Sequence, residues 1–182
     1  MNPLEHFRQM ARNNACSNLR LLRACRQLSP AEFTAKRVSF FPSIMLTLNH
    51  ILTVDWFYLD ALLREGRGLK VFESENPYAD CEALAKAQSA TDRRLIDFCD
   101  GLTAASAVEE ITMDRGGEMV PPERADAILL HLFQHQIHHR GQVHAMLAGT
   151  NLPPPQLDEY FLRYDRVRRA EDMRELGIAD SG

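Results

Sequence analysis

Four long stretches of the chain carry apolar residues at helical spacing, and residues that start or stop helices bound each stretch. The pair Asn2-Pro3 begins the first stretch, because Asn caps helices and Pro fits the first turn. The expected helices span residues 3–28, 43–65, 79–102 and 123–148. Four long helices with loops of moderate length predict an all-α four-helix bundle.

The segments between these helices predict smaller elements. Short alternating arms around Gly116-Gly117 indicate a β-hairpin within 108–121, just before the last bundle helix. An extra amphipathic C-terminal helix is expected over 157–176, with its charges on a solvated face. A length of 182 residues without a composition break predicts a single domain over 1–182.

Charge and cysteine usage exclude several classes of protein. The net charge of −4 argues against a nucleic-acid partner, which would need a basic face, and against docking on anionic membranes. We expect no membrane span and no secretory signal, because no stretch is apolar enough. The four cysteines form no C-x-x-C motif and are expected to be unpaired thiols. Together these features predict a cytoplasmic protein.

Five of the seven histidines lie within residues 131–144, on the last predicted helix. His135 and His139 are four residues apart, so both rings lie on one face, one turn apart. Ile128, Leu132 and Met146 share this face, which a bundle helix turns inward. Burying two imidazoles a turn apart is costly unless something satisfies their nitrogens. The pair is therefore a candidate for two ligands of one metal ion.

A third ligand must come from another helix, and His50 is the candidate. On the second predicted helix it lies on an apolar stripe with Leu46, Val54 and Phe57. The alternative for His50 alone, a hydrogen-bonded core histidine, is the commoner situation in proteins. Three neutral imidazoles would leave at least one coordination position for water or substrate, as in catalytic zinc sites.

Other polar residues near this face have open roles. His131 is expected to pack or to hydrogen-bond, and His138 and His144 to be exposed or to support the ligands. Gln142 lies on the histidine face and either orients a ligand or is a satisfied buried amide. Asp55 is the nearest carboxylate but points off the ligand face. Gly141 in mid-helix would be explained by another helix approaching closely.

The two histidine segments resemble one known family. Residues 129–147, with His-Gln-Ile-His-His-Arg-Gly-Gln at their centre, resemble the last bundle helix of the DinB family. Residues 43–56 (SIMLTLNHILTVDW) resemble its second helix, in which an Asn-His pair precedes an Asp-aromatic pair. The resemblance implies a four-helix bundle with one divalent metal ion on His50, His135 and His139. It also implies a tendency to form homodimers.

The resemblance leaves two classes of function open. Some relatives in the wider superfamily are thiol-dependent transferases or isomerases, so one hypothesis is a metal-dependent enzyme, a thiol S-transferase or a hydrolase. Its partner would be a small-molecule substrate, and for a transferase a low-molecular-weight thiol. The other hypothesis is a non-catalytic metal-binding stress-response or ligand-binding protein. Zinc is the first expectation for the metal, with nickel, iron or manganese as alternatives. A helical scaffold with packed histidines is the third possibility.

Overall fold

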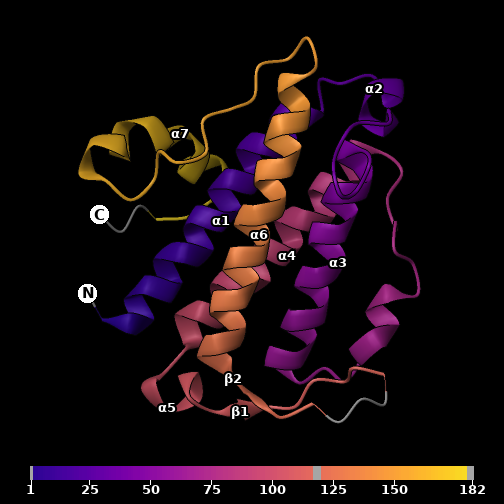
Figure 1. Cartoon of the computed structure of the whole chain (residues 1–182). Coiled ribbons are helices and arrows are strands. Elements are labelled where there is room, and N and C mark those ends of the chain that lie inside the picture. Colours follow the sequence, from indigo (N-terminus) through magenta and orange to yellow (C-terminus); the bar gives the residue numbers. More distant parts are fainter. Residues whose placement is uncertain (1, 117–119, 180–182) are drawn as a thin grey trace.

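The computed structural model describes residues 2–116 and 120–179. Its four long helices are α1 (Pro3–Cys25), α3 (Ile44–Leu63), α4 (Cys81–Gly101) and α6 (Ala125–Ala148). Helix α1 packs against α4 and α6, and α3 packs against the same two helices, so the four enclose a common core (Figure 1). The expected four-helix bundle is confirmed.

The helix starts follow from the capping residues in the sequence. The Asn2 side chain accepts a hydrogen bond from the Leu4 amide at 3.0 Å, and Ser43 accepts one from the Leu46 amide at 3.1 Å. Asp80 caps α4 in the same way. Helix α3 ends earlier than expected, because Arg64 adopts the left-handed conformation, with φ of 58°, before the glycines at 66 and 68.

Short elements connect the bundle. They are α2 (Pro30–Thr34), η1 (Gly68–Phe72), α5 (Ala104–Ala107), β1 (Glu110–Ile111) and β2 (Glu123–Arg124). The two strands pair antiparallel before α6, which confirms a small hairpin. Its second strand lies beyond the expected 108–121 range, directly against the start of α6. Gly117, in the predicted turn, lies outside the described residues.

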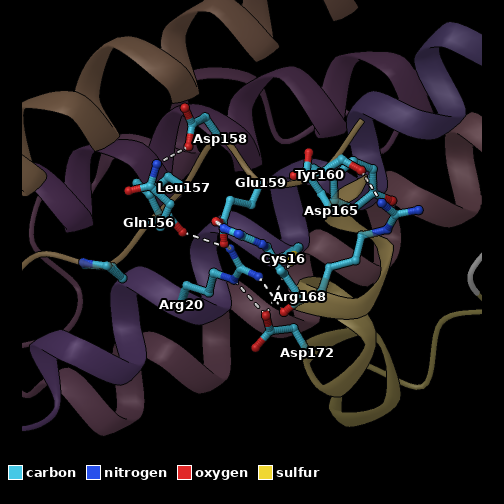
Figure 2. Close-up of polar contacts among 12 residues, drawn as sticks. Cys16, Arg20, Gln156, Leu157, Asp158, Glu159, Tyr160, Asp165, Arg168 and Asp172 are labelled. Carbon is cyan, nitrogen blue, oxygen red and sulfur yellow. Dashed lines mark hydrogen bonds and ion pairs between the residues drawn. The ribbon is translucent and has the colours of Figure 1, made fainter. Parts of the chain in front are cut away.

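The C-terminal segment folds back on α1 and contains η2 (Arg163–Asp165) and α7 (Arg166–Glu175). The expected helix over 157–176 therefore begins late, at Arg166. Asp172 is only 5 % exposed and pairs with Arg20 of α1, with Nε and Oδ2 2.7 Å apart (Figure 2). The prediction that the charges of this helix lie on a solvated face is wrong for Asp172, because its carboxylate is buried in an ion pair with Arg20 of α1.

The interior contains two clusters of buried apolar side chains along the bundle. Buried side chains from all four long helices form it, among them Leu21, Leu52, Leu95, Leu129 and Leu132. All four cysteines are free thiols, as expected. Within residues 2–116 and 120–179, no helix is long and apolar enough to cross a membrane.

Candidate metal centre

The bundle brings His50 of α3 together with His135 and His139 of α6. Each residue offers one ring nitrogen to a group whose members all lie within 4.8 Å of one another. The Nε2 atoms of His50 and His135 are 3.0 Å apart, and the ring centroids of His135 and His139 are 4.4 Å apart. The packing of α3 on α6 places all three rings in one cluster, which could hold a metal ion.

Burial keeps these imidazoles neutral. Desolvation, with the neighbouring His139, lowers the pKa of His50 from 6.5 to about 4. Desolvation and the surrounding histidines lower the pKa of His135 to about 3, and burial also lowers the pKa of His139. A metal ion binds the neutral form of imidazole, so near pH 7 protons do not compete for these nitrogens.

Protein groups alone do not satisfy all the ring nitrogens of this histidine cluster. The Nδ1 atom of His135 is buried and has no hydrogen-bond partner within the described part of the chain. Its Nε2 atom faces the His50 Nε2 atom, and only one of the two can carry the proton between them. Two nitrogens on one tetrahedral zinc ion, each about 2.0–2.1 Å away, would lie roughly 3.3 Å apart. The 3.0 Å separation of the His50 and His135 Nε2 atoms is close to this value, so these two nitrogens fit a zinc-like ion.

Gln142 orients one of the three rings. Its Oε1 atom lies 2.8 Å from His139 Nδ1 and accepts a hydrogen bond from it, which leaves Nε2 free as the ligand atom. Its amide nitrogen lies 3.1 Å from His138 Nε2, so His138 supports the arrangement from outside. Of the two roles left open for Gln142, the geometry favours that of orienting a ligand.

Phe41 covers the cluster from the segment before α3. Its ring centroid lies 4.2 Å from that of His50 and 5.7 Å from that of His139. Sequence reasoning misses this contact, because Phe41 stands in the sequence only as a residue before a helix start. No local pattern reports it, since the chain must turn back from α2 to place the ring there.

The remaining candidates lie apart from the ligand atoms. His131 stacks near His135, with ring centroids 6.4 Å apart, and meets Tyr58 at 5.2 Å. His144 faces away and lies 3.0 Å from the Pro155 carbonyl oxygen. Asp55 is 1 % exposed and accepts hydrogen bonds from Gln88 and Gln136 in the core. A carboxylate enclosed in this way is not placed to act as a base at the histidines.

A cavity of about 540 Å³ lies beside the centre, next to His131. Tyr58, Arg115, Glu123 and His131 line it, together with apolar side chains such as Met113 and Ile128. The Arg115 guanidinium lies over the rings of Phe57 and Tyr58 and donates to the Tyr58 hydroxyl at 3.2 Å. The cavity has room for a small molecule, and His131, whose ring lies 6.4 Å from that of His135, is the histidine that lines it.

Comparison with solved structures supports the fold. A DinB-like protein from Bacillus cereus ATCC 10987 superposes with a TM-score of 0.60 at 15 % identity, covering 77 % of this chain and 89 % of that chain. A DinB-like protein (YjoA) from Bacillus subtilis gives a TM-score of 0.58 at 20 % identity, covering 80 % and 96 %. At these identities the likeness concerns the fold alone.

Sequence comparison places the chain in a family. The uncharacterized protein YizA of Bacillus subtilis (strain 168) is 26 % identical over 131 residues, which cover 71 % of this chain and 79 % of YizA. The sequence model of the DinB family matches residues 1–172. Because that match spans nearly the whole length, the chain belongs to the DinB family.

Proposed function

We propose that the chain binds one divalent metal ion through His50, His135 and His139 and uses it as a metal-dependent enzyme. The observation that carries the proposal is the convergence of three nitrogen atoms within 4.8 Å, on two helices, in a partly dry site. Zinc is the first candidate, because three imidazoles and an open position are typical of catalytic zinc. Nickel, iron and manganese remain alternatives.

When bound, such an ion lowers the pKa of a coordinated water or holds a thiol as thiolate. The chain's own residues supply positioning. Gln142 holds His139 in the tautomer with a free Nε2 atom, and Phe41 limits the access of water. The cavity beside His131 would hold the substrate, with Tyr58, Arg115 and Glu123 as further polar groups of its lining. Two reaction classes suit this arrangement, transfer of a low-molecular-weight thiol and hydrolysis, and the first rests on analogy with the wider superfamily.

Metal analysis of single variants tests the site. Protein purified without a nickel column is reconstituted with zinc, dialysed and measured by elemental analysis. We expect one zinc ion per chain in the wild type, and loss of it in His50→Ala, His135→Ala and His139→Ala. His144→Ala on the same helix is the matched control and should keep the metal, since its ring faces the Pro155 carbonyl. Wild-type protein without metal, or ligand variants that keep it, would refute the proposal.

Cobalt substitution separates the two reaction classes. A thiolate that binds Co²⁺ adds an intense charge-transfer band, so a low-molecular-weight thiol such as cysteine should change the spectrum if the site activates thiols. An unchanged spectrum, together with cleavage of ester or amide substrates, would favour hydrolysis.

A non-catalytic role for the metal is the second candidate, and the geometry gives it one specific support. The cluster joins α3 to α6, so a bound ion would also act as a cross-link between two helices. Thermal unfolding with and without a chelator distinguishes the two roles. If removal of the metal melts the bundle, the structural role is favoured, and a fold that stays intact favours the enzyme.

A further inference from the structure

A second cavity lies on the side of α6 that faces away from the histidine cluster. It measures about 490 Å³, is open to solvent, and is lined by α1, α6 and the segment that follows α6. Helix α1 contributes Asn13 and Ser17 to its lining, and the segment contributes Leu157 and Phe161. Ligand cavities of small molecules fall in this range of volume and are mostly apolar with a few polar groups.

Arg140 of α6 is the charged group of this cavity. Its side chain is only 4 % exposed, and its Nη1 atom makes all of its hydrogen bonds, donating to Asn14, Asn18 and Gln136. All three acceptors are neutral amide oxygens. Within residues 2–116 and 120–179, no carboxylate lies within ion-pair distance of Arg140, although Asp92 and Asp55 act on its charge from the core, and no hydrogen bond from its Nε or Nη2 atom is found. Neither atom is among the buried side-chain atoms without a partner, and Arg140 is one of the residues that line the cavity.

Gly141 makes room beside this guanidinium. A Cβ atom built at this position would meet nothing within 4 Å. The expected close approach of another helix is therefore absent at this position. Glycine in mid-helix nevertheless lowers helix stability relative to alanine, so its presence needs another explanation. Gly141 instead lines the cavity, which any larger side chain at this position would narrow.

The outer wall of the cavity is held in place by polar contacts. The carbonyl oxygen of Gln156 accepts from Arg20 Nη1 at 2.9 Å, and Gln156 donates to the Asp158 carboxylate (Figure 2). Ser17 donates to the Leu157 carbonyl oxygen at 3.4 Å. These contacts tie the segment to α1, so the cavity is a built feature of the fold. Asp158 already has a partner in Gln156, and its negative charge lies on the exposed outer wall.

We propose that this cavity is a second ligand site, which binds a small organic carboxylate with an apolar body. The carboxylate would accept from the free Nε and Nη2 atoms of Arg140, since the planar guanidinium matches a carboxylate with two parallel hydrogen bonds. The apolar body would lie over Gly141 against Ile137, Leu157 and Phe161. Ile137 and Phe161 are large apolar side chains that are 48 % and 54 % exposed, and a ligand would cover them.

The test uses 4-phenylbutyrate and its neutral amide, 4-phenylbutyramide, as probes of matched shape. Both are titrated into ¹⁵N-labelled, zinc-loaded protein, and amide shifts give the place and the affinity of binding. We expect saturable shifts around Gly141 and Leu157, with the acid binding at least tenfold more tightly than the amide. The absence of saturable shifts there, or equal affinities for acid and amide, would overturn the proposal. So would shifts confined to the surroundings of His50, which would mean that the carboxylate binds the metal centre instead.

Two variants make the test specific. Gly141→Leu should fill the cavity and weaken the binding of 4-phenylbutyrate at least tenfold, while the zinc content stays unchanged. Gln134→Leu adds the same side chain at an exposed position of α6 outside the cavity and should bind like the wild type. Equal affinities of the two variants would refute the assignment. Arg140→Lys keeps the positive charge but loses the planar guanidinium that can donate two parallel hydrogen bonds. It should reduce the difference in affinity between the acid and the amide.

Discussion

Replacing Asp55 with asparagine should make the protein more stable, by an amount that grows with pH. Asp55 is 1 % exposed, and its Oδ2 atom accepts from Gln88 at 2.8 Å and from Gln136. Its Oδ1 atom is buried and has no partner within the described residues. Burial, together with the nearby carboxylate of Asp92, raises the pKa of Asp55 from 3.8 to about 8. The folded protein therefore holds a neutral carboxylic acid at this position near pH 7.

The direction of this pH dependence of stability follows from proton linkage. Between about pH 4 and pH 8 the folded state binds a proton at Asp55 that the unfolded state has released, so stability falls as pH rises through this window. Each pH unit within it costs about 1.4 kcal/mol per proton. From pH 5 to pH 8 the wild type should lose roughly 4 kcal/mol from this group alone. The asparagine side chain of the variant is a neutral isostere of the protonated acid and carries no such dependence.

Urea unfolding of both proteins at pH 5, 7 and 9, with chelator present throughout, measures the effect. We expect similar free energies of unfolding at pH 5 and an advantage of about 4 kcal/mol for Asp55→Asn at pH 8 and above. Histidine titration is shared by the two proteins and cancels in the difference. A difference that does not change with pH would show that Asp55 is ionised in the folded state, and the reasoning would fail. Zinc content should be equal in the two proteins, because Asp55 contacts none of the three histidines.

Three further substitutions test the centre and its support. Gln142→Leu removes the acceptor that orients His139 and should weaken metal binding about 10–100-fold in a chelator competition, with Gln142→Glu restoring most of it. Phe41→Ala uncovers His50 and should speed the loss of zinc to a chelator in stopped-flow measurements, while the free energy of unfolding changes little. Leu129→Ala leaves a hole in the fully buried core and should cost about 2–5 kcal/mol in urea unfolding, without changing the zinc content.

The helices and their facing sides could be predicted because the signals for them are local. Capping residues such as Asn2 and Ser43 set the starts, and the helical period alone put His135 and His139 on one face. The apolar stripe of the second long helix then identified His50 as the partner. These features depend on spacing along one helix, so a single sequence contains them.

The features that sequence reasoning missed depend on contacts between distant segments. Asp172 reads as a surface charge until α1 brings Arg20 to it, 152 residues earlier in the chain. Gln136 and Arg140 are polar residues that sequence reasoning did not single out, yet both are buried, because α3 supplies Asp55 to Gln136 and α1 supplies Asn14 and Asn18 to Arg140. No periodicity distinguishes a polar face that meets water from one that meets other polar side chains.

The buried polar network bears on what a metal at the histidines would do. Consecutive residues of α6 point to different sides, so His135 faces the metal centre while Gln136 reaches Asp55 of α3. The same holds for helix α3, whose His50 belongs to the histidine cluster and whose Asp55 belongs to the buried hydrogen-bond network. The seam between α3 and α6 is therefore held by hydrogen bonds in the core as well as by the histidine cluster, and a chain of 182 residues can bury a sufficient core without a metal cross-link. If a metal ion binds at the histidines, as we propose, this independent support of the seam and the nearby cavity of about 540 Å³ favour a role in chemistry at its open position over a role as a cross-link.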